Sequence, residues 1–460
     1  MFRIFATLIL TVLVTPVVAD TRVPQHQLEI QLGFAPLVKQ AAPAVVNIYA
    51  KRVVQERHSP FQNDPFFKDL FRDFGASRPT VQNSLGSGVI LTSDGYIVSN
   101  FHVVGGATDI RVVLNDRREF DARVLLADEE SDLAILKIEG VQDMPVLTLR
   151  NSDEIEVGEL VLAIGNPFGI GQTVSSGIVS GLARSGTATG NARGYFLQTD
   201  APINPGNSGG ALIDVNGQLI GVNTSILTRS GGSNGVGFAI PANLVGEVLH
   251  QAQMGHGTLT RPWAGMTGQA LDRGIAESFG LDRPEGIVIS DLHPQSPFLA
   301  AGIQPGDVVL AIDHQPVNTP PEMIFRMTVA GLGQEVAVTR FRDGTQSDVT
   351  VLMAPAPDYP DRETIAFGVD DVLAGMVVSK INPAVMTEFD LPFNGSGVVI
   401  EAPGSTGARL GFAPGDMLVQ INDTMIQRPS DVAHAFETGS RTFTVLFQRG
   451  LKQQAVRFRL

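Results

Sequence analysis

Residues 206–222 read Gly-Asn-Ser-Gly-Gly-Ala-Leu-Ile-Asp-Val-Asn-Gly-Gln-Leu-Ile-Gly-Val, and this stretch decides the fold. One serine, Ser208, stands among glycines, and two short apolar runs follow it on either side of an Asn-Gly pair. An Asn-Gly pair between apolar runs is a strong signal of a tight β-hairpin, because both residues tolerate the positive φ that the turn requires. The stretch therefore predicts a strand, a turn and a second strand directly after the serine.

The rest of residues 85–250 has the same character. Short apolar runs alternate with turns rich in glycine, asparagine and aspartate, and the whole chain holds 49 glycines and 28 prolines. Runs at this spacing predict an antiparallel barrel or sandwich. We expect helices only at the edges of this block, over Ala42–Tyr49 and Asn243–Gln253. The clearest apolar runs are 88–91, 111–114, 134–138 and 160–164.

The C-terminal part of the chain contains an internal repeat. Residues 263–266 and 373–376 both carry Ala-Gly-Met, and Pro-Gly-Asp follows at 305–307 and 414–416. Proline followed by glycine suits a type II turn, in which the glycine takes a positive φ. Two copies predict two similar small domains rather than a solenoid, whose repeats are shorter and more numerous. The proline-rich segment 354–360 between the copies predicts a stiff linker.

Composition limits the classes of protein to consider. The chain has 460 residues, and 33 Lys and Arg against 47 Asp and Glu give a net charge of −14. Nucleic acid is therefore not an expected partner, because binding its phosphates needs clustered cations. The absence of cysteine excludes disulfides, thiol nucleophiles and thiolate metal sites. Motifs for nucleotides and for zinc proteases are also missing, so the sequence predicts no cofactor and no metal.

The first 19 residues have the pattern of a cleavable secretory signal peptide. Arg3 forms a short positive region, an apolar stretch runs over 4–14, and small residues precede Asp20. The apolar stretch is too short for a typical membrane span. We therefore expect an exported protein, and an N-terminal anchor helix is the alternative.

Ser208 becomes a candidate nucleophile when the histidines and acids are considered with it. A serine hydroxyl needs a base, and His102 lies at the end of an apolar run, well before the serine. Asp132 opens another apolar run and can hold the imidazole in the required tautomer. The order His102, Asp132, Ser208 is that of the chymotrypsin class, whereas α/β-hydrolases have the serine first and a helix after it. A glycine-rich turn with an incidental serine is the remaining alternative.

Five motifs together resemble the HtrA/Deg family of serine proteases. They are Asn-Phe-His-Val-Val at 100–104, Ser-Asp-Leu-Ala at 131–134, Ile-Gly-Asn-Pro-Phe-Gly at 164–169, Gly-Asn-Ser-Gly-Gly at 206–210 and Gly-Val-Gly-Phe-Ala-Ile-Pro at 235–241. The resemblance implies a mainly β fold, in which a chymotrypsin-like double β-barrel protease domain is followed by two PDZ domains. It also implies His102 as the base, Asp132 as the residue that orients it, and Ser208 as the nucleophile. The oxyanion and substrate would then meet Gly206, Asn207 and the N–H of Ser208.

The resemblance also divides the chain. It implies a signal peptide at 1–19, a protease domain at 20–255 with a regulatory loop at 55–84, and PDZ domains at 258–355 and 362–460. Inside the loop, Asp64, Pro65 and Gly75 frame a predicted helix with phenylalanines along one side. The family's loop contacts neighbouring subunits, so we expect this face to pack on a neighbour. Packing on its own barrel is the alternative.

The family resemblance places the substrate pocket on two segments, which contribute Ile203 and then Thr224, Ser225, Ile226, Leu227 and Thr228. None of these residues is acidic, so we expect cleavage after small aliphatic residues rather than after Lys or Arg, since an unpaired buried cation is costly. The alternative is that they belong to the core of the barrel. Pro205 lacks an N–H, which we expect to limit flipping of the oxyanion loop.

The repeats are expected to bind peptides. Trp263, Ala264, Gly265 and Met266 fit the PDZ loop whose N–H groups bind a peptide's terminal carboxylate while the peptide adds as a strand. Residues 373–376 either do the same in the second copy, or the second PDZ domain serves assembly.

We therefore predict a periplasmic serine endopeptidase that degrades unfolded or misfolded exported proteins through an acyl-enzyme, with chaperone activity and regulation by its PDZ domains. The expected partners are unfolded polypeptides, C-terminal peptides and further copies of the chain, in a trimer or a higher multiple of three. A catalytically silent PDZ chaperone or adaptor is the alternative function.

Overall fold

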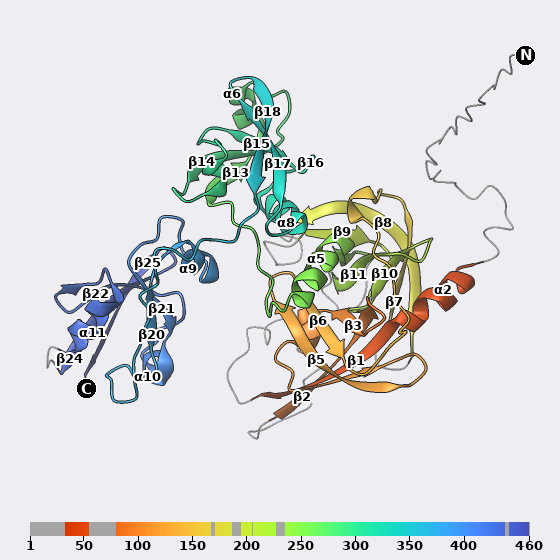
Figure 1. Cartoon of the computed structure of the whole chain (residues 1–460), viewed down its shortest axis with the longest axis horizontal. Helices are drawn as coiled ribbons and strands as arrows, with labels where there is room; N and C mark the ends of the chain where they lie inside the picture. The colour runs from red at the N-terminus through yellow and green to blue at the C-terminus, as the bar shows by residue number, and fades with distance from the viewer. Residues whose placement is uncertain are drawn as a thin grey trace, which may run out of the picture.

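Figure 1 shows a computed structural model of the chain, in which one large β body is followed by two smaller β domains. The structure describes residues 33–54, 80–166, 171–185, 195–204, 206–226, 235–437 and 441–459. The predicted signal peptide, the predicted phenylalanine-rich helix and Pro205 lie outside the described residues. Within the described ranges, no helix is long and apolar enough to cross a membrane.

Two closed antiparallel barrels form the large body, as the apolar runs predicted. The first has the strand order β1-β2-β3-β6-β5-β4 and the second β10-β11-β12-β9-β8-β7. Closing each sheet on itself pairs the edge strands that an open sheet would expose. The strands are β1 Val45–Val54, β2 Thr80–Ile90, β3 Tyr96–Ser99, β4 Asp109–Val113, β5 Glu119–Asp128, β6 Leu133–Ile138, β7 Leu160–Gly165, β8 Thr173–Ser185, β9 Tyr195–Thr199, β10 Ala211–Asp214, β11 Leu219–Ile226 and β12 Gly237–Pro241.

The stretch after Ser208 folds as predicted. β10 and β11 pair antiparallel, and Gly217 in the turn between them has φ +79°. The predicted C-terminal helix of this body is also present, as α5, Ala242–Gln253. Its buried side chains, which include Val245 and Val248, pack into a core shared with residues of both barrels.

The prediction of a helix over Ala42–Tyr49 is wrong. The helix, α2, covers Ala35–Ala41; a single 3-10 turn, η1, covers Ala42–Ala44, and β1 begins at Val45. The β-branched side chains of Val46 and Ile48 are fully buried in the first barrel, where β1 pairs with β2 on one side and β4 on the other. This long-range pairing outweighs the weak local helix preference of the segment.

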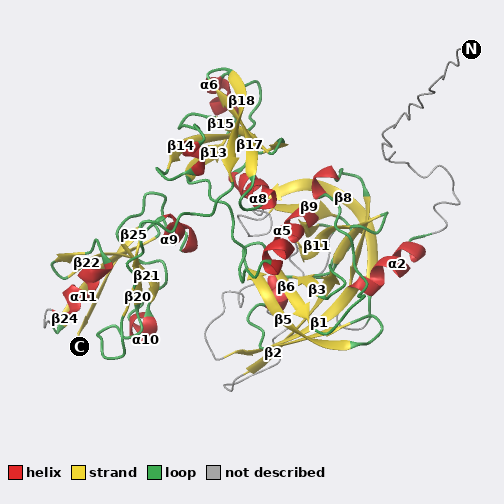
Figure 2. Ribbon diagram, in the orientation of Figure 1, coloured by secondary structure: helices red, strands yellow, loops and turns green. Residues whose placement is uncertain are grey.

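Each C-terminal domain has its own core and its own sheet. Figure 2 shows that short helices cover these sheets. The first domain contains β13 Met266–Ala270, α6 Arg273–Phe279, β14 Ile287–Leu292, α7 Pro297–Ala300, β15 Val308–Ile312, β16 Gln315–Pro316, α8 Pro320–Ala330, β17 Glu335–Arg342 and β18 Thr345–Leu352. The second contains β19 Ile365–Ala366, β20 Val377–Lys380, α9 Pro383–Glu388, β21 Val398–Ala402, α10 Gly404–Arg409, β22 Met417–Ile421, β23 Thr424–Met425, α11 Pro429–Glu437, β24 Thr442–Arg449 and β25 Lys452–Arg459.

In each Pro-Gly-Asp motif the aspartate is buried and pairs with an arginine that stays partly exposed. Asp307 accepts two hydrogen bonds from Arg342, at 2.5 and 2.6 Å, and Asp416 accepts two from Arg449, both at 2.6 Å. Both aspartates are buried, and a buried charge needs such a partner to be tolerated. The glycine before each aspartate has a positive φ, as the predicted turn requires: +93° in the first copy and +87° in the second.

Helix α8 of the first C-terminal domain lies against the large body (Figure 1). The ring of Phe325 stacks on Tyr195 of β9, with centroids 3.9 Å apart and planes 14° apart. The next residue, Arg326, pairs with Asp153 in the short turn η3, Ser152–Glu154. This contact joins the two domains through both an aromatic stack and a charge pair.

Candidate active site

The structure brings His102, Asp132 and Ser208 to the seam between the two barrels. His102 lies on α4, Phe101–Val104, directly after β3, and Asp132 lies in the turn before β6. The Nδ1 atom of His102 lies 2.9 Å from Oδ1 and 2.8 Å from Oδ2 of Asp132, and the backbone N–H of His102 donates to Oδ1 at 3.0 Å. This arrangement holds the proton on Nδ1 and keeps Nε2 for proton transfer.

Asp132 is held from three sides. It has φ +56°, and its carbonyl oxygen accepts hydrogen bonds from the N–H of Phe101 at 3.1 Å and from Nδ2 of Asn100 at 2.9 Å. The hydroxyl of Thr224, from β11 of the second barrel, donates to Oδ2 at 2.5 Å. The carboxylate therefore receives bonds from both barrels, which fixes its direction toward the imidazole.

Ser208 lies on the loop that leads into β10. Its hydroxyl donates to the carbonyl oxygen of Thr224 at 2.9 Å. Gly209, directly after it, has φ +82°, and a Cβ there would lie 2.1 Å from the carbonyl oxygen of Ser87. A larger residue at this position would therefore collide with β2, which explains why the loop needs glycine.

The backbone of the serine loop is anchored so that two N–H groups stay available. The carbonyl oxygen of Gly206 accepts from the hydroxyl of Ser87 at 2.7 Å, and that of Asn207 accepts from the N–H of Gly210 at 2.9 Å. Among the hydrogen bonds of the described residues, none is donated by the N–H of Gly206 or of Ser208. Two unengaged N–H groups beside a serine hydroxyl are the kind of donors that a developing oxyanion needs.

Comparisons with known proteins agree with this geometry. Residues 86–222 match the trypsin-like peptidase domain, and residues 264–353 and 398–449 each match a PDZ domain. A probable periplasmic serine endoprotease DegP-like of Halomonas elongata is 39% identical over 421 residues, which cover 87% of this chain and 87% of the relative. The chain belongs to the HtrA family of serine endopeptidases.

Further relatives support the assignment to the HtrA family. The periplasmic pH-dependent serine endoprotease DegQ of Escherichia coli is 36% identical over 396 residues, covering 85% of this chain and 83% of DegQ. The solved structure of the HtrA-type protease AlgW with decapeptide is 41% identical, covers 70% of this chain and 99% of that one, and has a TM-score of 0.51. AlgW with tripeptide is 40% identical, with a TM-score of 0.53 and coverage of 71% and 99%.

The residues expected around the substrate of this HtrA protease fall into different environments. Ile203 is fully buried in the core of the second barrel, which matches the alternative reading of its role. Thr224 directs its hydroxyl to Asp132, so this side chain supports the aspartate. Asn207 is buried, and its Oδ1 accepts from Thr173 at 3.4 Å. Ser225 and Ile226 belong to β11, and Leu227 and Thr228 lie outside the described residues.

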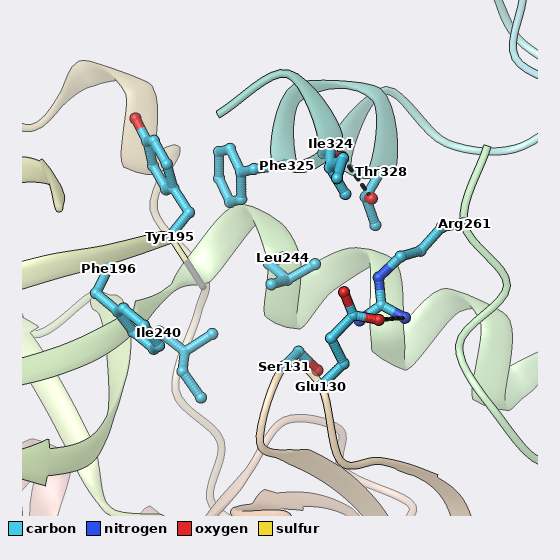
Figure 3. A pocket seen from close by; sticks show the side chains of 10 residues that line it. All are labelled: Glu130, Ser131, Tyr195, Phe196, Ile240, Leu244, Arg261, Ile324, Phe325 and Thr328. Carbon is cyan, nitrogen blue, oxygen red and sulfur yellow. Dashed lines mark hydrogen bonds and ion pairs between the residues drawn. The ribbon is translucent and has the colours of Figure 1, made fainter. Parts of the chain in front are cut away.

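The sequence did not indicate a support that reaches the site from the segment between α5 and β13. Arg261, between the protease domain and the first PDZ domain, donates to Asp128 at 3.0 and 2.6 Å and pairs with Glu130 at 3.4 Å. Asp128 in turn accepts from the N–H of Ser131 at 2.8 Å. Arg261 therefore holds the turn that ends at Asp132 in place. Figure 3 shows the guanidinium of Arg261 beside Glu130 of this turn, next to Ser131.

Electrostatics favour the charged form of this arginine. Burial alone would lower the pKa of Arg261, but the hydrogen bonds and the charge of Asp128, together with the charge of Glu130, outweigh it and raise that pKa. Arg261 therefore stays charged at any pH at which the enzyme works. No sequence motif marks this pair, because its two members lie 133 positions apart.

The predicted carboxylate-binding loop of the first PDZ domain is present between the linker and β13. Gly265 has φ +59°, and a Cβ there would lie 2.7 Å from the ring of Trp263, so the indole lies directly on this glycine. His293 donates its N–H to the carbonyl oxygen of Gly265 at 2.8 Å. Among the described residues, the N–H groups of Ala264 and Gly265 donate no hydrogen bond.

Proposed function

We propose that this HtrA protease cleaves unfolded polypeptides in the periplasm, with His102, Asp132 and Ser208 as its catalytic triad. The observation that carries the proposal is the double contact of Asp132 with His102, through Nδ1 and through the backbone N–H. Such a contact fixes both the tautomer and the position of the imidazole, which a structural histidine would not require. The relatives that are named periplasmic serine endoproteases support the same reaction and compartment.

The reaction follows from these contacts. The hydroxyl proton that Ser208 gives to the carbonyl oxygen of Thr224 is redirected to Nε2 of His102. The freed Oγ attacks the substrate carbonyl, and the N–H groups of Gly206 and Ser208 stabilise the oxyanion that forms. The imidazolium returns its proton to the leaving amine, and an acyl-enzyme remains. Water then attacks the acyl carbon as His102 takes a proton from that water. The bond from the acyl carbon to Oγ of Ser208 breaks, the imidazolium returns its proton to Oγ, and the acid product leaves.

Substrate choice is part of the proposal. The two segments that the family resemblance assigns to the substrate pocket contain apolar or hydroxyl side chains and no acid, which favours small aliphatic residues before the cleaved bond. The open loop of the first PDZ domain, Trp263–Met266, is placed to capture the C-terminus of a client chain. The structures of the HtrA-type protease AlgW with a decapeptide and with a tripeptide support the binding of peptides by such a protease.

The proposal extends to chaperone activity and to assembly in threes, since a trimer would place several binding domains around one client. Sedimentation of the purified chain checks the assembly: a mass of three chains or a multiple of three is expected. A monomer or dimer would contradict it.

Degradation of an unfolded, cysteine-blocked protein tests the activity. The mature chain is compared with Ser208→Ala, and the products are read by mass spectrometry. We expect the unaltered chain to cut after small aliphatic residues and Ser208→Ala to leave the substrate intact. If neither cuts, with or without added C-terminal peptides, while both suppress aggregation, the chain is a PDZ chaperone with a silent protease domain.

A further inference from the structure

The two PDZ domains differ at the strand to which a peptide would add. In the first domain the sheet runs β13-β14-β15-β17-β18, so β13 is an edge strand. In the second domain the corresponding strand, β20, is covered by one more strand, β19. β19 pairs antiparallel with β20, and Ile365 lies opposite Val378 and Ala366 opposite Val377. The chain itself therefore occupies the edge that an added peptide strand uses.

The backbone contacts continue beyond these two pairs. The N–H of Phe367 donates to the carbonyl oxygen of Met376 at 2.8 Å, and the N–H of Gly375 donates to the carbonyl oxygen of Phe367 at 3.0 Å. At the other end, the N–H of Lys380 donates to the carbonyl oxygen of Arg362 at 2.6 Å. Gly375 belongs to the loop that would bind a terminal carboxylate, so Phe367 lies where the last residue of a bound peptide would lie.

The side chain of Phe367 fills the space beside this loop. It is 9% exposed and belongs to the same buried cluster as Val378 of β20 and as Val432 and Ala435 of α11. A strand on one side and a helix on the other are the walls between which a PDZ domain holds the last side chain of its ligand. The apolar place for a ligand's last side chain is therefore taken.

Polar contacts hold the rest of the segment. The hydroxyl groups of Thr364 and Ser379 lie 2.6 Å apart. Glu363 pairs with Lys380 at 3.2 Å and with Arg428 at 2.8 Å, and these cations favour its charged form by lowering its pKa. Residues 362–367 thus contact β20 and its surroundings along their whole length.

The first PDZ domain lacks this arrangement. The residue that begins its loop, Trp263, donates its N–H to the carbonyl oxygen of Ala354, at the end of the domain, at 2.8 Å. The segment before this loop is therefore tied to the C-terminal end of the domain instead of pairing with β13. The difference between the two copies comes from the path of the segment before the loop.

We propose that residues 362–367 are a built-in ligand of the second PDZ domain, which competes with client chain ends for the groove between β20 and α11. The inference rests on the proposed capture of chain ends by this protease. Because the segment is continuous with the loop, it competes at an effective concentration of about 1 mM or more. With an intrinsic Kd of the segment for its own groove on the order of 10 µM, a peptide would bind the second domain about 100-fold more weakly than without the segment.

Hydrogen exchange on the full mature chain carrying Ser208→Ala tests this without altering either PDZ domain. The probe is a decapeptide with a free carboxylate and a C-terminal phenylalanine. We expect slow exchange at Gly375 and Lys380 before any peptide is added and no change afterwards, whereas residues 264–270 become protected by the peptide. Fast exchange at Gly375 and Lys380 in the free protein, or new protection there on adding peptide, would overturn the proposal.

A second variant counts the sites. Phe367→Ala is expected to raise the number of bound peptides from one to two per chain, while Val369→Ala, at a position that is 90% exposed, leaves it at one. Two peptides bound to the chain with Phe367 intact would refute the proposal. If no peptide binds anywhere, the capture of chain ends fails, and the exchange rates in the free protein still decide whether the segment is docked. If Phe367→Ala unfolds the domain, the exchange rates at Gly375 and Lys380 in the chain with Phe367 intact still test the proposal.

Discussion

Arg261, in the segment between α5 and β13, should control the rate of catalysis although it does not reach the substrate. Replacing it with methionine keeps the length of the side chain and removes the guanidinium that binds Asp128 and Glu130. The carboxylate of Asp128, 9% exposed, then keeps the N–H of Ser131 as its remaining hydrogen-bond donor among the contacts described above.

The magnitude follows from that burial. Leaving one member of a buried ion pair without its partner costs about 3–5 kcal/mol. Because Arg261 is partly exposed, we expect a local cost of about 2–3 kcal/mol, enough to release the turn from Asp128 to Asp132. A shift of Asp132 by about 1 Å lowers the rate by roughly 100-fold. We therefore expect a fall in kcat of about 10- to 100-fold with little change in KM.

Two measurements on the purified chain check this. The first is kcat and KM on a short peptide, and the second is the rate at which a fluorophosphonate labels Ser208, which reports the reactivity of its hydroxyl group. Arg273→Met is the matched control, because Arg273 makes an exposed i,i+4 pair with Glu277 in the first PDZ domain. If Arg261→Met keeps both rates within twofold of the Arg273→Met control, the turn holds Asp132 without the help of Arg261, and the reasoning fails.

Three further predictions concern the other domains. Phe325→Ala removes the ring stacked on Tyr195 and should destabilise the contact between α8 and the protease body by about 3–5 kcal/mol. Hydrogen exchange in α8 should then become faster, and unchanged exchange would show that the stack is not needed. Asp416→Asn should lower the free energy of unfolding of the second PDZ domain by about 1–2 kcal/mol in thermal denaturation, because Arg449 is 42% exposed and can be hydrated when the carboxylate is lost; cleavage of short peptides is the control activity. The hydrogen bond from Arg362 lowers the pKa of Asp358, so this contact stabilises the linker above the unfolded value of about 3.9 and is lost as the pH falls through the lower folded value. The N–H of Ala384 donates to the carbonyl oxygen of Pro357 at 3.1 Å. Its protection factor, corrected for the intrinsic pH dependence of exchange, should fall toward pH 3, and an unchanged factor would contradict this.

Much of the fold could be predicted from local patterns. The apolar run, Asn-Gly turn and apolar run after Ser208 became β10, a turn and β11, because hairpin signals act between neighbouring residues. The segment before Tyr49 could not be predicted in this way. Its valines and isoleucine lie in β1, which pairs with β2 and β4, and both of these strands are far from it in the sequence.

The candidate site shows the same division. His102, Asp132 and Ser208 could be selected from residue type, order and neighbours, and the structure brings them together. Thr224 was placed in the pocket by resemblance, whereas its hydroxyl bonds Asp132, because β11 of one barrel meets the turn before β6 of the other. Nothing in the sequence around Arg261 indicates that it binds that same turn.

The sequence by itself determined the class of this protein: an antiparallel β protease with two repeated domains, because strand periods, turn residues and catalytic motifs are local. Tertiary structure alone decided which supports reach Asp132 and which of the two repeats presents an open edge. The two loops carry the same Ala-Gly-Met, yet one is preceded by a segment tied to Ala354 and the other by a strand that covers β20. Such choices depend on where a segment finds hydrogen-bond partners in space, and the order of residues does not record that.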